Sequence, residues 1–192
     1  HQVAWQHIDG QVKKQIDIPV SNEELTFAFE EMRRLFEENE VDFLLLEMMS
    51  IPSRTVPLYD CVADSTLPVW CGLSAKRQNY KSKITSFHDE RVIFEDNVKT
   101  AALYDFDVMG IMHTSVDLIS DCISIIKKFH KGPLMAYPDS GYFQAPNWQF
   151  VDIITPQDLF NFAEIWRTEG VNIFGGCCGL GPEHTSLLSQ MK

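Results

Sequence analysis

The stretch Val171-Asn172-Ile173-Phe174-Gly175-Gly176-Cys177-Cys178-Gly179 joins an apolar run to a glycine-rich turn that carries two cysteines. The apolar run is typical of a short buried strand. Neighbouring side chains on a regular strand point to opposite faces, so both sulfur atoms can reach one ion only if the backbone bends. Glycine permits such a bend at low conformational cost. The stretch therefore predicts a strand that ends in a metal-binding turn.

A repeated pattern of strand and helix extends from this stretch toward the N-terminus. We expect strands at residues 41–46, 67–73, 108–112, 134–137 and 171–174, and helices at 22–38, 55–63, 95–104, 115–129 and 156–168. Ser21 and Glu24 form a predicted capping box for the first helix. The residues before Ser21 are expected to form a loop. Nearly continuous apolar strands that alternate with helices are typical of a parallel sheet covered by helices.

Polar side chains follow the carboxyl ends of these strands, namely Glu47, Ser74, His113, Asp139, Cys177 and Cys178. This is the active-site face of a (β/α)8 barrel, and a doubly wound open sheet would place its site there too. No glycine-rich phosphate loop occurs in the sequence. Five strand-helix units are visible, whereas a barrel has eight. We therefore expect an α/β fold of TIM-barrel type, in one domain over residues 1–192, that lacks the first three strands.

Composition excludes several classes of partner. The 192 residues are 45% hydrophobic, and the formal net charge of −11 argues against binding to nucleic acids or anionic membranes. The longest apolar runs, such as residues 43–46, are too short to span a bilayer. Five irregularly spaced cysteines argue against a disulfide framework and favour a reducing cytoplasm.

Several motifs together make the sequence similar to the homocysteine S-methyltransferase family. Gly175-Gly176-Cys177-Cys178-Gly179 followed by Pro182-Glu183-His184 resembles the C-terminal signature of that family. Tyr137-Pro138-Asp139-Ser140-Gly141 resembles its Tyr-Pro-Asn-Ser-Gly motif, and residues 47–52 and 110–113 resemble two further strand ends. Their order and spacing agree across residues 21–192.

The resemblance implies a zinc ion held by His113, Cys177 and Cys178, with the homocysteine thiol in the fourth position. His113 stands where the family has a third cysteine. Glu47 corresponds to the acid that holds the substrate amino group, and Asp139 and Ser140 belong to the substrate-binding motif. Asp139 replaces the asparagine of the family motif.

The residues alone leave other interpretations open. The two adjacent cysteines could be small buried hydrophobic residues, and His113 a hydrogen-bonded strand-end residue. Glu47 could form a surface salt bridge. The basic run at 76–83 is expected to be a solvated loop, with a contact to an anionic donor as the alternative. Phe143 and Trp148 are candidates for an aromatic wall beside a sulfonium or betaine donor, or for a simple cover of the barrel mouth.

The resemblance thus implies a zinc-dependent S-methyltransferase that makes methionine from homocysteine and a donor of the S-methylmethionine or betaine type. One alternative is a non-catalytic or split-barrel relative that works as a homo-oligomer or with a complementing N-terminal chain. Another is that the zinc site activates a different thiol.

Overall fold

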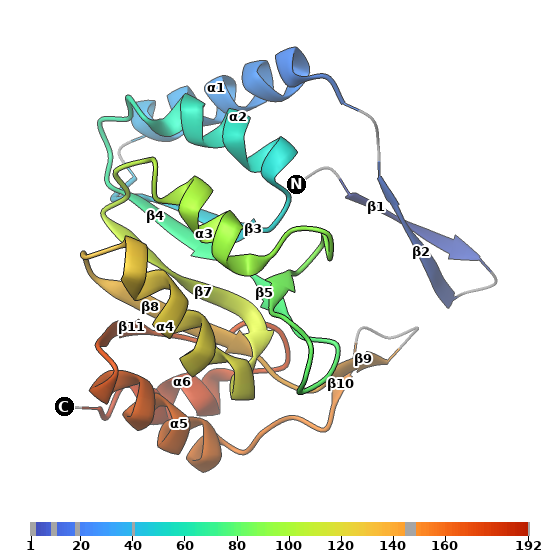
Figure 1. Cartoon of the computed structure of the whole chain (residues 1–192), viewed down its shortest axis with the longest axis vertical. Coiled ribbons are helices and arrows are strands. Elements are labelled where there is room, and N and C mark those ends of the chain that lie inside the picture. The colour runs from blue at the N-terminus through green and yellow to red at the C-terminus, as the bar shows by residue number, and fades with distance from the viewer. Residues whose placement is uncertain (1–2, 9–10, 18–19, 40, 145–148, 192) are drawn as a thin grey trace.

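A five-stranded parallel sheet forms the centre of the computed structural model, which describes residues 3–8, 11–17, 20–39, 41–144 and 149–191 (Figure 1). The strands lie in the order β11-β8-β7-β4-β3, and each pairs in parallel with its neighbours. Their bounds are Leu44–Met49 for β3, Val69–Leu73 for β4, Val108–Ser115 for β7, Leu134–Asp139 for β8 and Val171–Phe174 for β11. The predicted α/β class and parallel sheet are confirmed.

The helices are α1 (Asn22–Glu38), α2 (Pro52–Val62), α3 (Phe94–Ala101), α4 (Ile119–Phe129), α5 (Pro156–Thr168) and α6 (Pro182–Leu188). A 3-10 turn, Val116–Leu118, precedes α4. Each connection between sheet strands moves one position in the same direction, so right-handed crossovers place the connecting helices on one face. Figure 1 shows α2, α3 and α4 over that face. Within the described residues β3 and β11 remain edge strands, so a closed barrel is not seen.

Local signals explain where several helices begin. The Ser21 hydroxyl accepts a hydrogen bond from the Glu24 N–H at 3.2 Å, and the Glu24 carboxylate accepts one from the Ser21 N–H at 2.9 Å. The predicted capping box is therefore confirmed, as are the bounds of α1 and α5. Helix α2 begins at Pro52, three residues before the prediction, because proline suits the first turn of a helix.

The prediction of a loop before Ser21 was wrong. Residues Val3–Ile8 (β1) and Gln11–Asp17 (β2) pair as an antiparallel hairpin apart from the main sheet. The sequence does carry a hairpin signal, because an Asp-Gly pair separates two strand-like segments. Two further hairpins were not predicted: β5 (Ala75–Lys76) with β6 (Thr85–Ser86), and β9 (Tyr142–Gln144) with β10 (Gln149–Val151).

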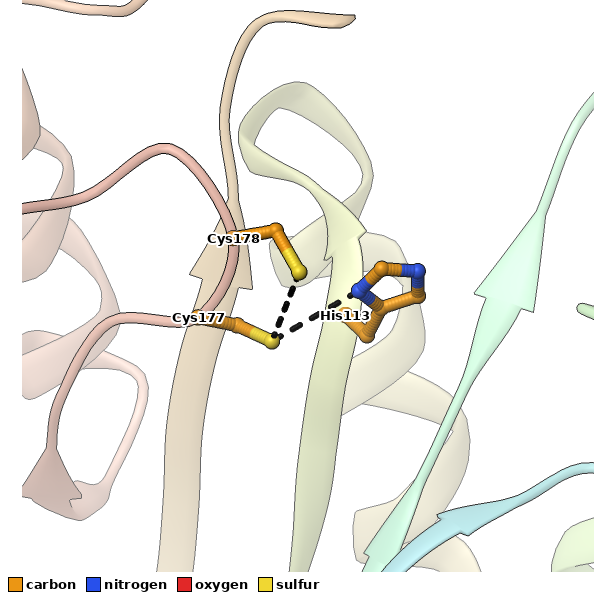
Figure 2. Close-up of side chains that lie close together, drawn as sticks. All are labelled: His113, Cys177 and Cys178. Atoms are coloured by element: carbon orange, nitrogen blue, oxygen red, sulfur yellow. Dashed lines mark hydrogen bonds between the residues drawn. The ribbon is translucent and has the colours of Figure 1, made fainter. Parts of the chain in front are cut away.

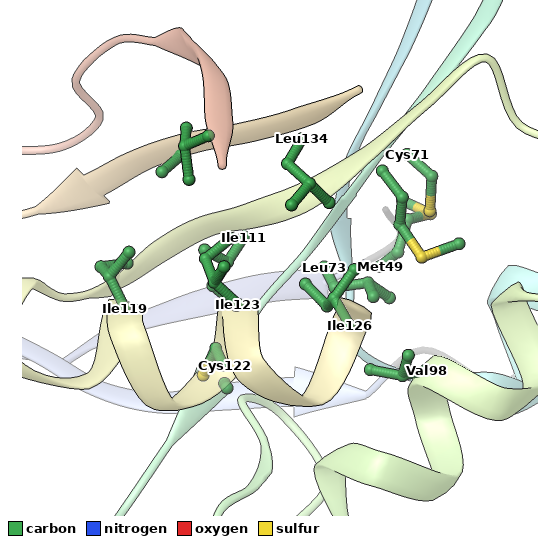
Figure 3. Packing of buried hydrophobic residues seen from close by; sticks show 14 of the residues in the cluster. Met49, Cys71, Leu73, Val98, Ile111, Ile119, Cys122, Ile123, Ile126 and Leu134 are labelled. Carbon is green, nitrogen blue, oxygen red and sulfur yellow. The ribbon is translucent and has the colours of Figure 1, made fainter. Parts of the chain in front are cut away.

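The main core lies between the sheet and the helices. Alternate residues of the strands face it, for example Cys71 and Leu73 on β4 and Ile111 on β7. Figure 3 shows Ile123 and its neighbours on α4 packed into this layer. Cys61, Cys71 and Cys122 are buried, and all five cysteines are free thiols. Among the described residues no helix has the length and apolar character needed to cross a membrane.

Replacing Ile123 by alanine should lower the free energy of unfolding by about 2–5 kcal/mol, because its side chain is only 1% exposed and the cavity would not refill. The matched control is Ile165→Ala on α5, where the side chain is 50% exposed and the expected change is within about 0.5 kcal/mol. Urea unfolding followed by circular dichroism measures both. Equal losses in the two variants would contradict this assignment of the core.

Candidate metal centre

Three side chains from distant parts of the chain meet at the carboxyl end of the sheet. His113 lies on β7, and Cys177 and Cys178 lie in the turn after β11. The Cys177 Sγ lies 3.5 Å from His113 Nδ1 and 3.7 Å from Cys178 Sγ. Figure 2 shows the three side chains converging, and their ligand atoms all lie within 4.8 Å of one another. We call this set the metal triad.

The two short distances fit the geometry of a tetrahedral metal site. With zinc–sulfur and zinc–nitrogen bonds of about 2.3 and 2.0 Å, two sulfur ligands lie about 3.8 Å apart, and sulfur and nitrogen about 3.5 Å apart. The observed values of 3.7 and 3.5 Å match these edges. The triad could therefore hold an ion and leave a fourth position for another ligand.

An irregularity in β7 aims the His113 side chain at the two thiols. The pairing with β8 shifts register between Met112 and Ser115, and His113 has a φ of 41°, in the left-handed region. The buried Thr114 hydroxyl donates to the Met112 carbonyl at 2.8 Å and accepts from the Ala75 N–H at 2.9 Å. Such conformations persist where surrounding contacts enforce them, often at functional sites. Thr114 supplies those contacts here.

The cysteine turn is fixed by backbone hydrogen bonds to the end of β8. The Cys177 N–H donates to the Pro138 carbonyl at 2.8 Å, and the Ser140 N–H donates to the Cys178 carbonyl at 3.0 Å. Gly179 follows with a φ of 81°, and a Cβ there would lie 2.1 Å from the Ser140 carbonyl oxygen. Only glycine fits this position. The turn is thus shaped by contacts that the sequence motif alone does not reveal.

The surroundings disfavour a free thiolate at Cys177. Burial, followed by the neighbouring Cys178, raises the pKa of the Cys177 thiol to about 12. The thiol is therefore protonated near neutral pH unless a cation is present. A bound metal ion reverses this preference, because a coordinating thiol loses its proton.

Asp139 and Ser140 lie beside the triad. An Asp139 carboxylate oxygen, Oδ2, is 3.7 Å from His113 Nδ1. Burial raises the pKa of this carboxyl group, while the nearby His113 lowers it. The Ser140 hydroxyl accepts a hydrogen bond from the Ile154 N–H at 2.8 Å and so fixes the following loop. Both residues are placed near the centre, and their role toward a substrate stays a prediction.

Glu47 lies on β3, on the side of the sheet opposite the helices, and its side chain is exposed. The structure places it near Tyr137 of β8 rather than in the triad. Burial and then the Glu47 charge raise the pKa of the Tyr137 hydroxyl well above its ordinary value. That hydroxyl is buried and has no hydrogen-bond partner within the described residues. A Cβ on Gly72 would lie 2.6 Å from it, so glycine on β4 makes room for the tyrosine.

Sequence reasoning missed a second neighbour of the triad. Phe87, just after β6, packs edge-to-face on His113 with ring centroids 4.8 Å apart. Nothing in its local sequence pattern indicates this contact, because the loop after β4 has no periodicity that fixes its path. Trp148 lies outside the described residues. His184 accepts from the Gly181 N–H at 3.1 Å through Nδ1 and so caps the start of α6.

Comparisons with known proteins identify a family for this chain. A family model described as homocysteine S-methyltransferase matches residues 6–191. A selenocysteine methyltransferase from Astragalus bisulcatus is 24% identical over 155 residues, which are 78% of this chain and 44% of the relative.

Two solved structures share the fold. The oxidised form of the homocysteine methyltransferase MmuM from Escherichia coli has a TM-score of 0.65 at 20% identity, over 90% of this chain and 53% of its own. The metallated form of the same enzyme has a TM-score of 0.65 at 19% identity, over 91% and 54%. The chain thus spans about half the length of these relatives.

Gly179→Ala should weaken metal binding, because the new Cβ would push the cysteine turn away from Ser140. Gly170→Ala is the matched control: its φ of 102° is also positive, but the nearest atom to a new Cβ is the end of Lys127 at 3.7 Å. Cobalt titration, read from the thiolate absorption bands, measures both variants. Equal cobalt affinities in the two variants would show that the turn does not depend on Gly179.

Proposed function

Because the chain belongs to the homocysteine S-methyltransferase family, we propose that it transfers a methyl group to the thiol of homocysteine at a zinc ion held by His113, Cys177 and Cys178. The single observation that carries this proposal is the metal triad, whose two short edges fit a tetrahedral site. A catalytic zinc site has three protein ligands and one position for water or substrate. The triad has this form.

The donor set suits zinc. Imidazole and thiolate groups are common zinc ligands in proteins, and two thiolates with a neutral imidazole balance the charge of the ion. The existence of a metallated form of the related E. coli enzyme supports a metal in this family. Compared with three thiolates, this set has one negative charge fewer. We therefore expect a more acidic substrate thiol and a less nucleophilic thiolate, by the usual relation between thiol pKa and reactivity.

When bound, zinc lowers the pKa of a substrate thiol so that the thiolate is present at neutral pH. The thiolate lone pair forms the new bond to the methyl carbon, while the bond from that carbon to the donor breaks and its electron pair leaves with the donor. We propose a donor of the S-methylmethionine or betaine type and methionine as the product. Because the chain is similar to a selenocysteine methyltransferase, a selenol and other thiols should be tested as methyl acceptors beside homocysteine.

Glu47 is proposed to hold the substrate ammonium group. Its carboxylate lies on the open face of the sheet near the Tyr137 hydroxyl, which has no hydrogen-bond partner in the described part of the chain. A charge-assisted bond from the ammonium group to this carboxylate would orient the amino acid. Asp139 and Ser140 are proposed to border the same substrate from β8. A reducing cytoplasm would keep the thiols of the triad available for metal.

A second candidate is a relative that needs a complementing chain to complete a barrel. The specific observation is the open β3 edge beside exposed apolar side chains, where Phe27 is 70%, Met32 51% and Leu45 40% exposed. An unpaired strand edge next to an apolar surface favours pairing with further strands. On this alternative the 192 residues alone would bind metal weakly or not at all.

The purified protein should contain about one zinc ion per chain after dialysis. Replacing His113 by alanine or Cys177 by serine should remove it, because two remaining ligands hold the ion poorly. His130→Ala, at a histidine that contacts the Pro133 carbonyl in a separate loop, should leave the zinc content unchanged. Elemental analysis gives the stoichiometry. Zinc-free wild-type protein, even after refolding with metal, would contradict the proposal and favour the second candidate.

Glu47→Gln should raise the KM for homocysteine by about tenfold or more with a smaller change in kcat, because it removes a charged contact that substrate and transition state share. The control substrate is 4-mercaptobutyrate, which is homocysteine without its amino group. Its kinetics should differ little between wild type and variant. A similar loss for both thiols would show that Glu47 acts in some other way.

A further inference from the structure

A cavity of about 690 Å³ lies next to the metal triad, among the loops that follow β4, β7 and β8. This volume is in the range typical of small-molecule sites. Two residues connect the cavity to the triad. Phe87 lines it and packs against His113, and Asp139 lines it with a carboxylate oxygen 3.7 Å from His113 Nδ1. A ligand in the cavity would therefore lie beside the position that the triad leaves for a thiol.

The charges around the cavity favour a cation. Its two basic side chains are already neutralised, since Lys76 pairs with Glu90 at 2.7 Å and Arg77 with Asp121 at 2.7 Å. These two residues of the basic run therefore leave little unpaired positive charge in the cavity for an anionic donor. Three carboxylates also line the cavity, namely Asp117, Asp139 and Asp152. None of them pairs with a lysine or arginine within the described ranges.

Aromatic rings that line the cavity also favour a cation, in particular a weakly hydrated one. Phe87 and Phe162 both line the cavity. The Lys76 ammonium already lies 5.8 Å from the centroid of Phe87, so this ring faces positive charge. Aromatic faces attract quaternary ammonium and similar cations, which carry little hydration to lose. Carboxylates and aromatic rings that line one cavity together suit an onium group better than a small metal cation.

We propose that this cavity binds the methyl donor as a sulfonium or quaternary ammonium cation, with Asp117 and Asp152 attracting its charge and Phe87 contacting its methyl groups. This inference rests on the proposed function and adds the location of the donor and the residues that hold it. During transfer the methyl carbon loses its bond to the onium atom, which keeps the electron pair and becomes neutral. For a sulfonium donor the departing thioether has then lost the charge that the carboxylates attract, which favours its release.

The first test measures equilibrium binding by calorimetry to the chelator-treated, metal-free protein. S-methylmethionine is the probe, and methionine is its counterpart without the sulfonium charge. We expect S-methylmethionine to bind about tenfold more tightly or better than methionine. The double variant Asp117→Asn/Asp152→Asn should lose this preference. The control variant Asp64→Asn/Asp105→Asn makes the same change in net charge at positions outside the cavity and should keep it.

A second measurement does not depend on those substitutions. In saturation-transfer NMR with the wild-type protein, the sulfonium methyl protons should receive the strongest signal, and Phe87→Leu should reduce it. Equal binding of methionine and S-methylmethionine, no binding of either, or equal behaviour of the two double variants would overturn the proposal.

Activity assays separate this inference from the proposed function. Methyl transfer with an unchanged donor KM in Asp117→Asn/Asp152→Asn would leave the function in place and contradict the donor cavity. Selective onium binding without transfer to any thiol would contradict the function and retain a cation site.

Discussion

The site depends on the way in which the chain after β11 is tied to the end of β8. Two backbone hydrogen bonds, from Cys177 to Pro138 and from Ser140 to Cys178, hold the cysteine turn alongside β8. Because they join main-chain groups, they fix the backbone of both cysteines before any metal binds. Gly179 permits this close approach, and the bulge in β7 brings His113 to meet the thiols. The placement of the three metal-binding residues therefore depends on close contacts between main-chain segments.

The proposed site has two sides with different properties. On the open face of the sheet, Glu47 and the Tyr137 hydroxyl provide polar groups for an amino acid. On the side of the loops, the cavity provides carboxylates and aromatic rings. The triad borders both regions, since Phe87 and Asp139 of the cavity contact His113, and Cys177 lies near Tyr137. A thiol and an onium donor could therefore approach from different directions, which an in-line displacement requires, and each would meet surroundings of suitable charge.

Much of this fold could be predicted from the sequence, because periodic apolar patterns and caps are local signals. The strand at 171–174, the helices at 22–38 and 156–168, and the capping box at Ser21 were confirmed in the structure. The triad was expected as a set from the family resemblance, and the structure brings its three side chains together. Contacts made by loops were not foreseen. Phe87 reaches His113 through a loop whose path is set by the β5–β6 hairpin, and short hairpins of two-residue strands leave little pattern in a sequence.

An ion held by the metal triad would join segments that are far apart in the sequence. His113 belongs to β7, whereas both cysteines follow β11, and β8 lies between these strands in the sheet. An ion in the triad would therefore act as a cross-link across β8, closing a long loop that contains α4 and α5. Closing such a loop removes entropy from the unfolded chain, and metal binding is then coupled to folding. The last strand and α6 would be the part of the molecule most strongly anchored by the ion, so the metal would serve as a structural clamp as well as a chemical centre.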